Sequence, residues 1–166
     1  MLFILDAYNV IHKIPELEIC LERDLRTARD ALTGLCQQLL SKRGDIQQII
    51  LVFDGNSRFR HLPQIHPPKI KIVFSETEED ADEKIVDVLE EKSGRVEKVV
   101  VSDDNFVRNH ARAYKARVMK AAEFYSLIRK TRSRQLPEAG GERKPLAPSL
   151  ADAITLHYKK ALGLSD

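Results

Sequence analysis

The chain has 166 residues, of which 43% are hydrophobic and 31% charged, and its formal net charge is +2. This composition can build a hydrophobic core, which excludes a wholly disordered chain, and the length suits one domain with a terminal extension. No apolar run approaches the roughly 20 residues of a membrane span, and no secretion signal is recognised at the N-terminus. We therefore expect a cytoplasmic protein with no membrane segment.

The first part of the chain predicts three strands and one long helix. Residues 2–6 (LFILD) form a continuous apolar run that ends in an acid, which is typical of a strand buried on both faces. Apolar side chains recur at three- and four-residue steps through residues 22–42, which predicts an amphipathic helix. Residues 49–53 (IILVF) predict a second buried strand that ends at Asp54, and residues 69–75 (KIKIVFS) predict an edge or half-exposed strand.

The second part continues the alternation and then changes in composition. The elements predicted are, in order, an acidic helix (79–92), a buried strand (98–102), a basic helix (105–114), a short strand (116–119) and a helix (121–129). A basic linker with three prolines follows, and Ser149 begins a last helix. We therefore divide the chain into a main domain, residues 1–130, and an extension of it, residues 131–166. The alternation predicts an α/β fold with a mostly parallel central sheet and helices on both faces.

Three of the predicted buried strands end at an aspartate, namely Asp6, Asp54 and Asp103. A single aspartate in such a place is a common turn or capping residue. The carboxyl ends of parallel strands, however, meet at one edge of a sheet, and ligands bind there. Carboxylates that converge repel one another unless a proton or a cation lies between them, and Mg²⁺ or Mn²⁺ suits ligands that are all oxygen.

Two further side chains are candidates for the same edge. Asp82 precedes Ile85 by three residues and Leu89 by seven, so it shares the buried face of the acidic helix. The alternative is a favourable charge at the start of that helix. Asn9 follows Asp6 by three residues, on the predicted first strand-to-helix loop, where its amide could orient a phosphate or a metal-bound water. A turn or capping asparagine is the simpler explanation of its spacing.

The motifs resemble those of a known family. Residues 6–11 (DAYNVI), which follow the first apolar strand, resemble the opening signature of the NYN domain family, a branch of the PIN-like nucleases. The chain is similar in particular to the YacP-like bacterial subgroup, with VFDG at 52–55, EDADEKI at 79–85 and VVVSDD at 99–104 in the family's order. One departure is Ala7, where these proteins often carry glycine.

This resemblance implies a three-layer α/β/α PIN-like fold and a metal-dependent ribonuclease, expected to be an endoribonuclease. It implies one or two Mg²⁺ or Mn²⁺ ions, with Asp6, Asp82 and Asp103 as the metal-site acids. Asn9 falls on the signature asparagine, and Asp54 matches the second strand-end acid, to which we assign outer-shell support. The catalytic set expected is therefore Asp6, Asn9, Asp54, Asp82 and Asp103. The resemblance also implies cleavage of messenger RNA on the ribosome.

Charge is distributed unevenly along the chain. Nine of the sixteen residues 76–91 are acidic, whereas residues 107–160 hold thirteen lysines and arginines against four acids. Each segment taken alone is explained by a solvated surface, but a basic surface beside an acidic centre suits an RNA backbone. The residues predicted to bind RNA are Arg58, Arg60, Arg108, Arg112, Lys115, Arg117, Arg132 and Arg134.

Two other classes of protein stay open at this point. One is a module that binds RNA or the ribosome with little catalysis of its own. The other is a receiver-like domain, which is also a parallel α/β fold, with Asp54 as phosphate acceptor and Lys120 as its basic partner. Against the receiver, Asp6 has no adjacent acid, and the acidic residues 76–91 would have no task.

Overall fold

The computed structural model describes residues 1–55, 68–75, 81–92, 94 and 96–133. The elements follow in the order β1 (Leu2–Asp6), α1 (Ala7–Lys13), α2 (Pro15–Arg23), α3 (Leu25–Lys42), β2 (Gln48–Phe53), β3 (Ile70–Phe74), α4 (Ala81–Glu91), β4 (Lys98–Val101), α5 (Asn105–Ala113), β5 (Arg117–Met119) and α6 (Ala121–Ser133). All lie within one compact unit, Met1–Gln135. Most of the extension predicted for residues 131–166 therefore lies outside the described residues.

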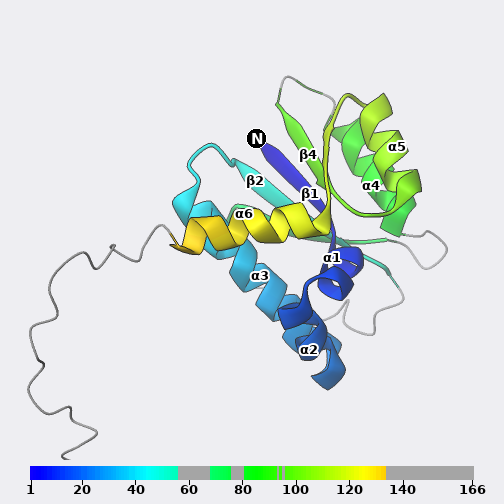
Figure 1. The fold of residues 1–166 in the computed structure, drawn as a ribbon. Coiled ribbons are helices and arrows are strands. Elements are labelled where there is room, and N and C mark those ends of the chain that lie inside the picture. The colour runs from blue at the N-terminus through cyan, green and yellow to red at the C-terminus, as the bar shows by residue number, and fades with distance from the viewer. Residues whose placement is uncertain (56–67, 76–80, 93, 95, 134–166) are drawn as a thin grey trace, which may run out of the picture. The chain divides into compact units, whose positions relative to one another are not determined.

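The five strands form one parallel sheet in the order β3-β2-β1-β4-β5 (Figure 1). The expected α/β fold with a parallel sheet is thereby confirmed, and β3 is an edge strand, as the lysines of its sequence indicate. In the register, Leu5 of β1 lies between Leu51 of β2 and Val101 of β4. The strand order differs from the 2-1-3-4-5 order of receiver-type folds, so the receiver interpretation loses its structural basis.

Helices cover both faces of the sheet, as expected, and the two faces have separate cores. Side chains of alternate strand residues, such as Phe3 and Leu5, pack in one cluster with α1, α2, α3 and α6. The intervening residues, such as Leu2 and Ile4, pack in a second cluster with α4 and α5. Because strand side chains alternate between faces, a run that is apolar at every position must have both faces covered. The three layers of the expected α/β/α arrangement follow from this pattern.

Two helices lie where the sequence analysis placed a loop. α1 begins directly at Ala7, with Asp6 as its N-cap, and α2 begins at Pro15. Proline is tolerated there because the N–H groups of the first helical residues have no acceptor within the helix, so proline, which lacks this group, loses no helical hydrogen bond. Asn9 consequently lies in the first turn of α1, and its expected position in a loop is wrong.

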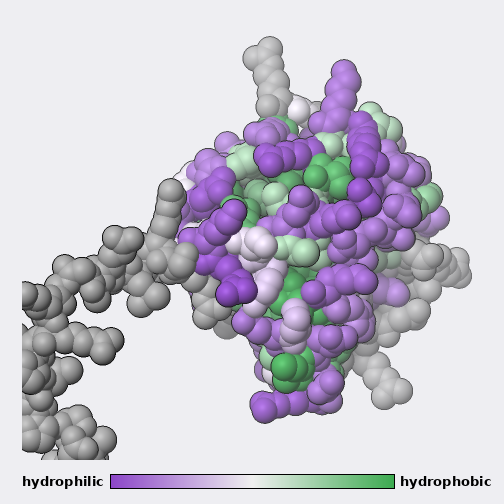
Figure 2. Space-filling model, viewed as in Figure 1, coloured by the Kyte–Doolittle hydropathy of each residue, from purple (hydrophilic) through white to green (hydrophobic). Residues whose placement is uncertain are grey.

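Polar and apolar side chains are mixed on the one face of the described part that Figure 2 shows. On the face shown in Figure 2, hydrophilic side chains dominate, and apolar ones appear as small separate patches. In the described segments, no helix has the length and apolar character needed to cross a membrane.

Candidate active site

The carboxyl edge of the sheet is organised around Asp6, the last residue of the central strand. Its side chain is only 6% exposed. One carboxylate oxygen accepts a hydrogen bond from the backbone N–H of Asn9 (3.2 Å), and the other accepts one from the hydroxyl of Ser102 (3.0 Å). Burial raises the pKa of Asp6 above its ordinary value of 3.8, the two hydrogen bonds lower it in part, and the charges of Asp104 and Asp103 raise it further. The edge therefore concentrates negative charge with little solvent to screen it.

Asn9 ties the first helix to the end of β4. Its side-chain carbonyl accepts the backbone N–H of Asp103 (3.0 Å), a residue 94 positions later in the chain. The same residue donates its own N–H to Asp6, so it connects two of the predicted acids. The structure thus gives the amide a positioning role, and its predicted action on phosphate or water stays a prediction.

Asp103 and Asp104 have different surroundings although they are adjacent. Asp103 is half-buried, and its carboxylate accepts the N–H of Ala121 at the start of α6 (3.3 Å). Asp104 is the N-cap of α5, since its carboxylate accepts the N–H groups of Phe106 (2.6 Å) and Val107 (3.2 Å). Its own N–H donates to Ser102 (3.0 Å). We call Asp6, Asn9, Ser102 and Asp103 the acidic half of the carboxyl edge.

The ends of β2 and β3 carry a second group of side chains, which we call the aromatic half. The Tyr8 ring meets Phe53 edge-on at 5.6 Å between centroids, and Phe53 lies 5.8 Å from Phe74. Asp54 follows Phe53 and is half-buried. Burial raises the pKa of Tyr8, the charge of Asp54 raises it further, and the charge of Arg29 lowers it. The charge of Asp54 thus acts on Tyr8. The acids whose charges act on Asp6 are Asp103 and Asp104 instead.

Ser75 makes polar contacts in the aromatic half. Its hydroxyl accepts the backbone N–H of Gly55 at 2.8 Å in a buried position, and its own N–H donates to the carbonyl of Phe53 (2.9 Å). These contacts hold the residues that follow β2 against the end of β3.

Asp82 lies in the first turn of α4 and is half-buried, as the helical spacing predicts. Because α4 follows β3 in the chain, its first turn lies towards the carboxyl side of the sheet. Within the segments that the structure describes, no three carboxylate, imidazole or thiol side chains are grouped closely enough to hold one metal ion. Asp82 therefore stays a predicted ligand.

The chemistry of the acidic half nevertheless fits a divalent cation. Carboxylate and amide oxygens are the ligands that Mg²⁺ and Mn²⁺ prefer. The pKa of Asp6 is raised partly by two neighbouring carboxylates, which is a repulsion that a bound cation would relieve. Asp6 and Asp103 are the residues of this half that would hold it.

Sequence reasoning missed Ser102 as part of this half and Arg29 altogether. Ser102 is fully buried and bonds both Asp6 and Asp104. Arg29 is buried on the apolar side of α3, three residues before Leu32 and seven before Cys36. That spacing was the available signal, because a charged residue within an apolar stripe is unusual.

The predicted RNA-binding residues fall into three groups. Arg58, Arg60 and Arg134 lie outside the described residues, and Arg132 lies in α6 without a described side chain. Arg108 is half-buried and Arg112 exposed on α5. Lys115 and Arg117 are exposed, but Arg117 pairs with Val99 near the start of β4. That position is about 13 Å of strand away from Asp103. RNA binding by these two residues stays a prediction.

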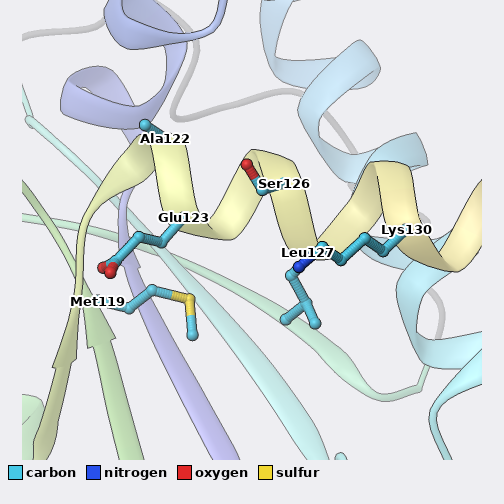
Figure 3. Close-up of a pocket in the computed structure, with 6 residues that line it drawn as sticks. All are labelled: Met119, Ala122, Glu123, Ser126, Leu127 and Lys130. Atoms are coloured by element: carbon cyan, nitrogen blue, oxygen red, sulfur yellow. The ribbon is translucent and has the colours of Figure 1, made fainter.

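A separate hollow lies along α6 and the end of β5 (Figure 3). It is lined by Met119, Ala122, Glu123, Ser126, Leu127 and Lys130. The Glu123 carboxylate accepts the N–H of Lys120 (2.8 Å) and so caps the start of α6. The lining offers one acid and one base on an otherwise mixed surface, and we assign it no chemical role.

The family model described as the YacP-like NYN domain matches residues 3–162. The chain belongs to the YacP-like NYN domain family. The resemblance inferred from the motifs is thereby confirmed, and the NYN family places the chain among PIN-like ribonucleases.

Solved structures support the same fold. The crystal structure of Rae1 (YacP) from Bacillus subtilis matches with a TM-score of 0.65 at 19% identity, over 98% of this chain and 85% of that one. A point mutant of the same protein matches with a TM-score of 0.67 at 22% identity, over 80% of this chain and 77% of that one. At such identities the likeness establishes the fold. The comparison with curated proteins finds no match.

Proposed function

We propose that this protein is an endoribonuclease that hydrolyses RNA phosphodiester bonds at the carboxyl edge of its sheet, with Mg²⁺ or Mn²⁺. The observation that carries the proposal is the buried Asp6 carboxylate. It accepts hydrogen bonds from Ser102 and Asn9, and the negative charges of Asp103 and Asp104 act on it. Membership of the YacP-like NYN family supports RNA as the substrate. The predicted ligands are Asp6, Asp82 and Asp103, for one or two ions.

When bound, the metal would supply an activated water and neutralise charge on the phosphate oxygens. The protein's own residues would do the positioning. Ser102 and the Asn9 N–H fix both oxygens of Asp6 in one orientation. The Asn9 side chain holds the backbone of Asp103, so that the two acids keep a constant separation. Asp54 lies in the aromatic half beside Tyr8 and is proposed as outer-shell support.

The test is cleavage of a labelled single-stranded RNA with Mg²⁺ or Mn²⁺, in wild type and in Asp6→Asn. Glu18→Gln is the control, because Glu18 is an exposed acid on α2. We expect metal-dependent cleavage by wild type and Glu18→Gln, lost in Asp6→Asn and in the presence of a chelator. Cleavage by Asp6→Asn at the wild-type rate would contradict the proposed site.

We further propose that the RNA is messenger RNA on the ribosome, as the YacP-like family suggests. The same reaction run with and without translating ribosomes tests this point. Cleavage that is faster on ribosome-bound RNA supports it, and equal rates contradict it.

A second candidate function is RNA or ribosome binding without catalysis. It is favoured by the finding that no three metal-ligating side chains are grouped in the described segments. RNA binding by wild type without cleavage, in either metal and with ribosomes present, would select it.

A further inference from the structure

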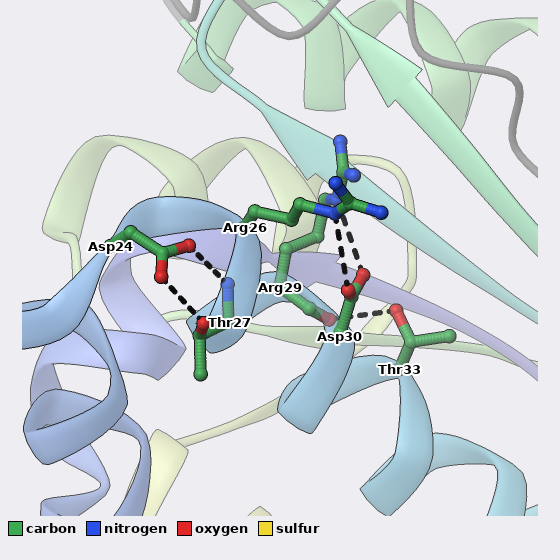
Figure 4. Close-up of polar contacts among 6 residues, drawn as sticks. All are labelled: Asp24, Arg26, Thr27, Arg29, Asp30 and Thr33. Carbon is green, nitrogen blue, oxygen red and sulfur yellow. Dashed lines mark hydrogen bonds and ion pairs between the residues drawn. The ribbon is translucent and has the colours of Figure 1, made fainter.

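Two arginines on consecutive turns of α3 share one carboxylate but differ in burial. The Nε atoms of Arg26 and Arg29 each lie 3.8 Å from an oxygen of Asp30. Figure 4 draws both ion pairs. The Arg26 side chain is 63% exposed, whereas that of Arg29 is 8% exposed. Arg26 therefore behaves as an ordinary surface cation, and Arg29 is a buried one.

Among the described residues, the buried Arg29 guanidinium has no acceptor for its Nε–H and no closely bonded anion. Its Nε is buried and has no hydrogen-bond partner among the residues that the structure describes. Asp30 is too distant to accept a hydrogen bond and is itself 63% exposed, so its charge is largely screened by water. The backbone carbonyl of Arg29 accepts the Thr33 hydroxyl (2.8 Å), but this contact does not involve the charge. A buried cation normally has an anion that bonds it, because leaving it without one is costly.

The position of Arg29 places this cation at the carboxyl edge. α3 ends just before β2 begins, so the last turns of α3 lie near the amino end of β2 and its first turns towards the carboxyl side. Arg29 is the fifth residue of α3. Its charge acts on Tyr8, which packs on Phe53 and is also influenced by Asp54. Arg29 thus belongs to the aromatic half, on the same edge as the acids.

We propose that Arg29 binds a phosphate of the RNA strand, next to the phosphate that is hydrolysed at the acidic half. The guanidinium has five N–H donors in a planar fork, and two phosphate oxygens can accept from it together. The terminal nitrogens carry four of these donors and are the atoms that a phosphate would reach. We place the phosphate at Arg29 because the acids of the same edge repel the phosphates of the RNA backbone, whereas this buried cation attracts one. This inference rests on the proposed function for the identity of its ligand.

The test measures RNA binding rather than cleavage. Asp6→Asn serves as the background, so that a labelled single-stranded RNA stays intact, and the dissociation constant is determined at a series of salt concentrations. Arg29→Met removes the charge and keeps an unbranched side chain. Arg26→Met is the matched control, since it removes the exposed partner of the same Asp30.

We expect Arg29→Met to weaken binding about ten- to a hundred-fold, which is the effect of losing a hydrogen bond to a charged group. The slope of log affinity against log salt concentration should fall by about 0.7, the value for one phosphate contact on a single strand. Arg26→Met should change affinity by less than about two-fold. Arg29→Lys keeps the charge but loses the planar fork, so it should weaken binding with the salt slope unchanged.

Several outcomes would overturn the inference. Affinity and slope equal to the background for Arg29→Met would show that no phosphate is bound. Weaker binding with an unchanged slope, together with a lower urea midpoint, would show a structural role. If Arg29→Met fails to fold, wild-type affinity of Arg29→Lys is the contradicting result. An Arg29-dependent affinity for a polyglutamate peptide, with RNA binding unaffected, would identify an acidic protein as the ligand instead.

The proposed function can fail separately. RNA binding that depends on Arg29, in a wild-type protein that never cleaves, would support this inference and contradict the nuclease. Cleavage by wild type with binding that is independent of Arg29 would do the reverse.

Discussion

At the ends of β1 and β4, polar side chains bond to one another and to the backbone, and Ser102 reaches Asp6 over 96 residues. At the ends of β2 and β3, by contrast, aromatic rings pack on one another. The acidic half concentrates negative charge on fixed carboxylates, whereas the aromatic half holds a buried cation. The difference teaches that one sheet edge can separate the acids that we propose as metal ligands from the cation that we propose to bind a phosphate.

The largest expected effect comes from the acidic half. Asp6→Asn should reduce RNA cleavage about a thousand-fold, because metal ions contribute several kcal/mol to such reactions and each 1.36 kcal/mol is ten-fold in rate. Single-turnover cleavage with excess enzyme measures it. The variant keeps the size of the side chain, so its circular dichroism spectrum should match that of wild type. A loss of less than ten-fold would argue that the acids lie outside the catalytic centre.

Ser102 and Ser75 provide a direct comparison of the two halves, since both are fully buried serines at the carboxyl edge. Ser102→Ala removes the donor to Asp6, and Ser75→Ala removes the acceptor for Gly55. Each leaves a buried polar group without that partner, so each should lower the free energy of unfolding by about 1–3 kcal/mol. Urea titration measures this quantity.

Only the Ser102 variant should also affect chemistry. Partners that orient metal ligands typically contribute 10- to 100-fold in affinity or activity, so Ser102→Ala should lower cleavage by about ten-fold or more. Ser75→Ala should change it by only a few-fold once both proteins are folded. Equal losses of activity would erase the distinction between the two halves.

A smaller effect is expected at Asp104, which lies beside the acidic half as the N-cap of α5. Asp104→Ala should cost about 1 kcal/mol in unfolding free energy, the usual value for an N-cap. Asp24→Ala is the control, because Asp24 caps α3 through Thr27 (2.7 Å) in an exposed position. Thermal unfolding should show similar losses in both variants. A much larger loss of cleavage in Asp104→Ala than in Asp24→Ala would show that Asp104 also acts in the reaction.

The smallest effect is a dependence of stability on pH in the metal-free protein. The pKa of Asp6 is raised in the folded state, so its contribution to stability is greatest below its ordinary pKa of 3.8 and is lost as the pH rises through the folded value. Near pH 7, Asp6→Asn should therefore be more stable than wild type, with the difference shrinking towards pH 4. Urea titrations with a chelator present measure both points. A variant that is less stable than wild type near pH 7 would contradict the raised pKa.

Much of the fold was predictable because its strands are continuous apolar runs. Such runs are typical of a parallel sheet with both faces covered, and the acids after them then fall on one edge. Asp6, Asp54 and Asp103 were found by this argument. Two helices, α1 and α2, were not predicted. α1 begins directly after β1, and α2 begins at a proline, so no linker in the sequence marks their starts.

The contacts that organise the site were beyond sequence reasoning for a physical reason. Asp6, which accepts from the Ser102 hydroxyl, and Asp103, which donates to the Asn9 side chain, each lie more than 90 residues from that partner in the chain. Spacing along a sequence carries no information about such pairs. The burial of Arg29 depends on the packing of α3 against the sheet, which overrides the usual preference of arginine for the surface. The internal bonding of the candidate site therefore had to come from the structure, and the roles of its residues stay predictions.

The central position of β1 has a consequence for how the protein folds while it is being synthesised. Of the five strands of this sheet, the first to be synthesised is also the middle one, and its residue Leu2 has its second neighbour only once Lys98 has been synthesised. At translation rates of about 5–20 residues per second, that interval is about 5–20 seconds. During it, one side of this apolar strand has no partner, and contacts so distant in the chain also form slowly. Folding of this domain should thus finish only after β4 has left the ribosome, and a nascent chain stopped before β4 should be the form most prone to aggregation.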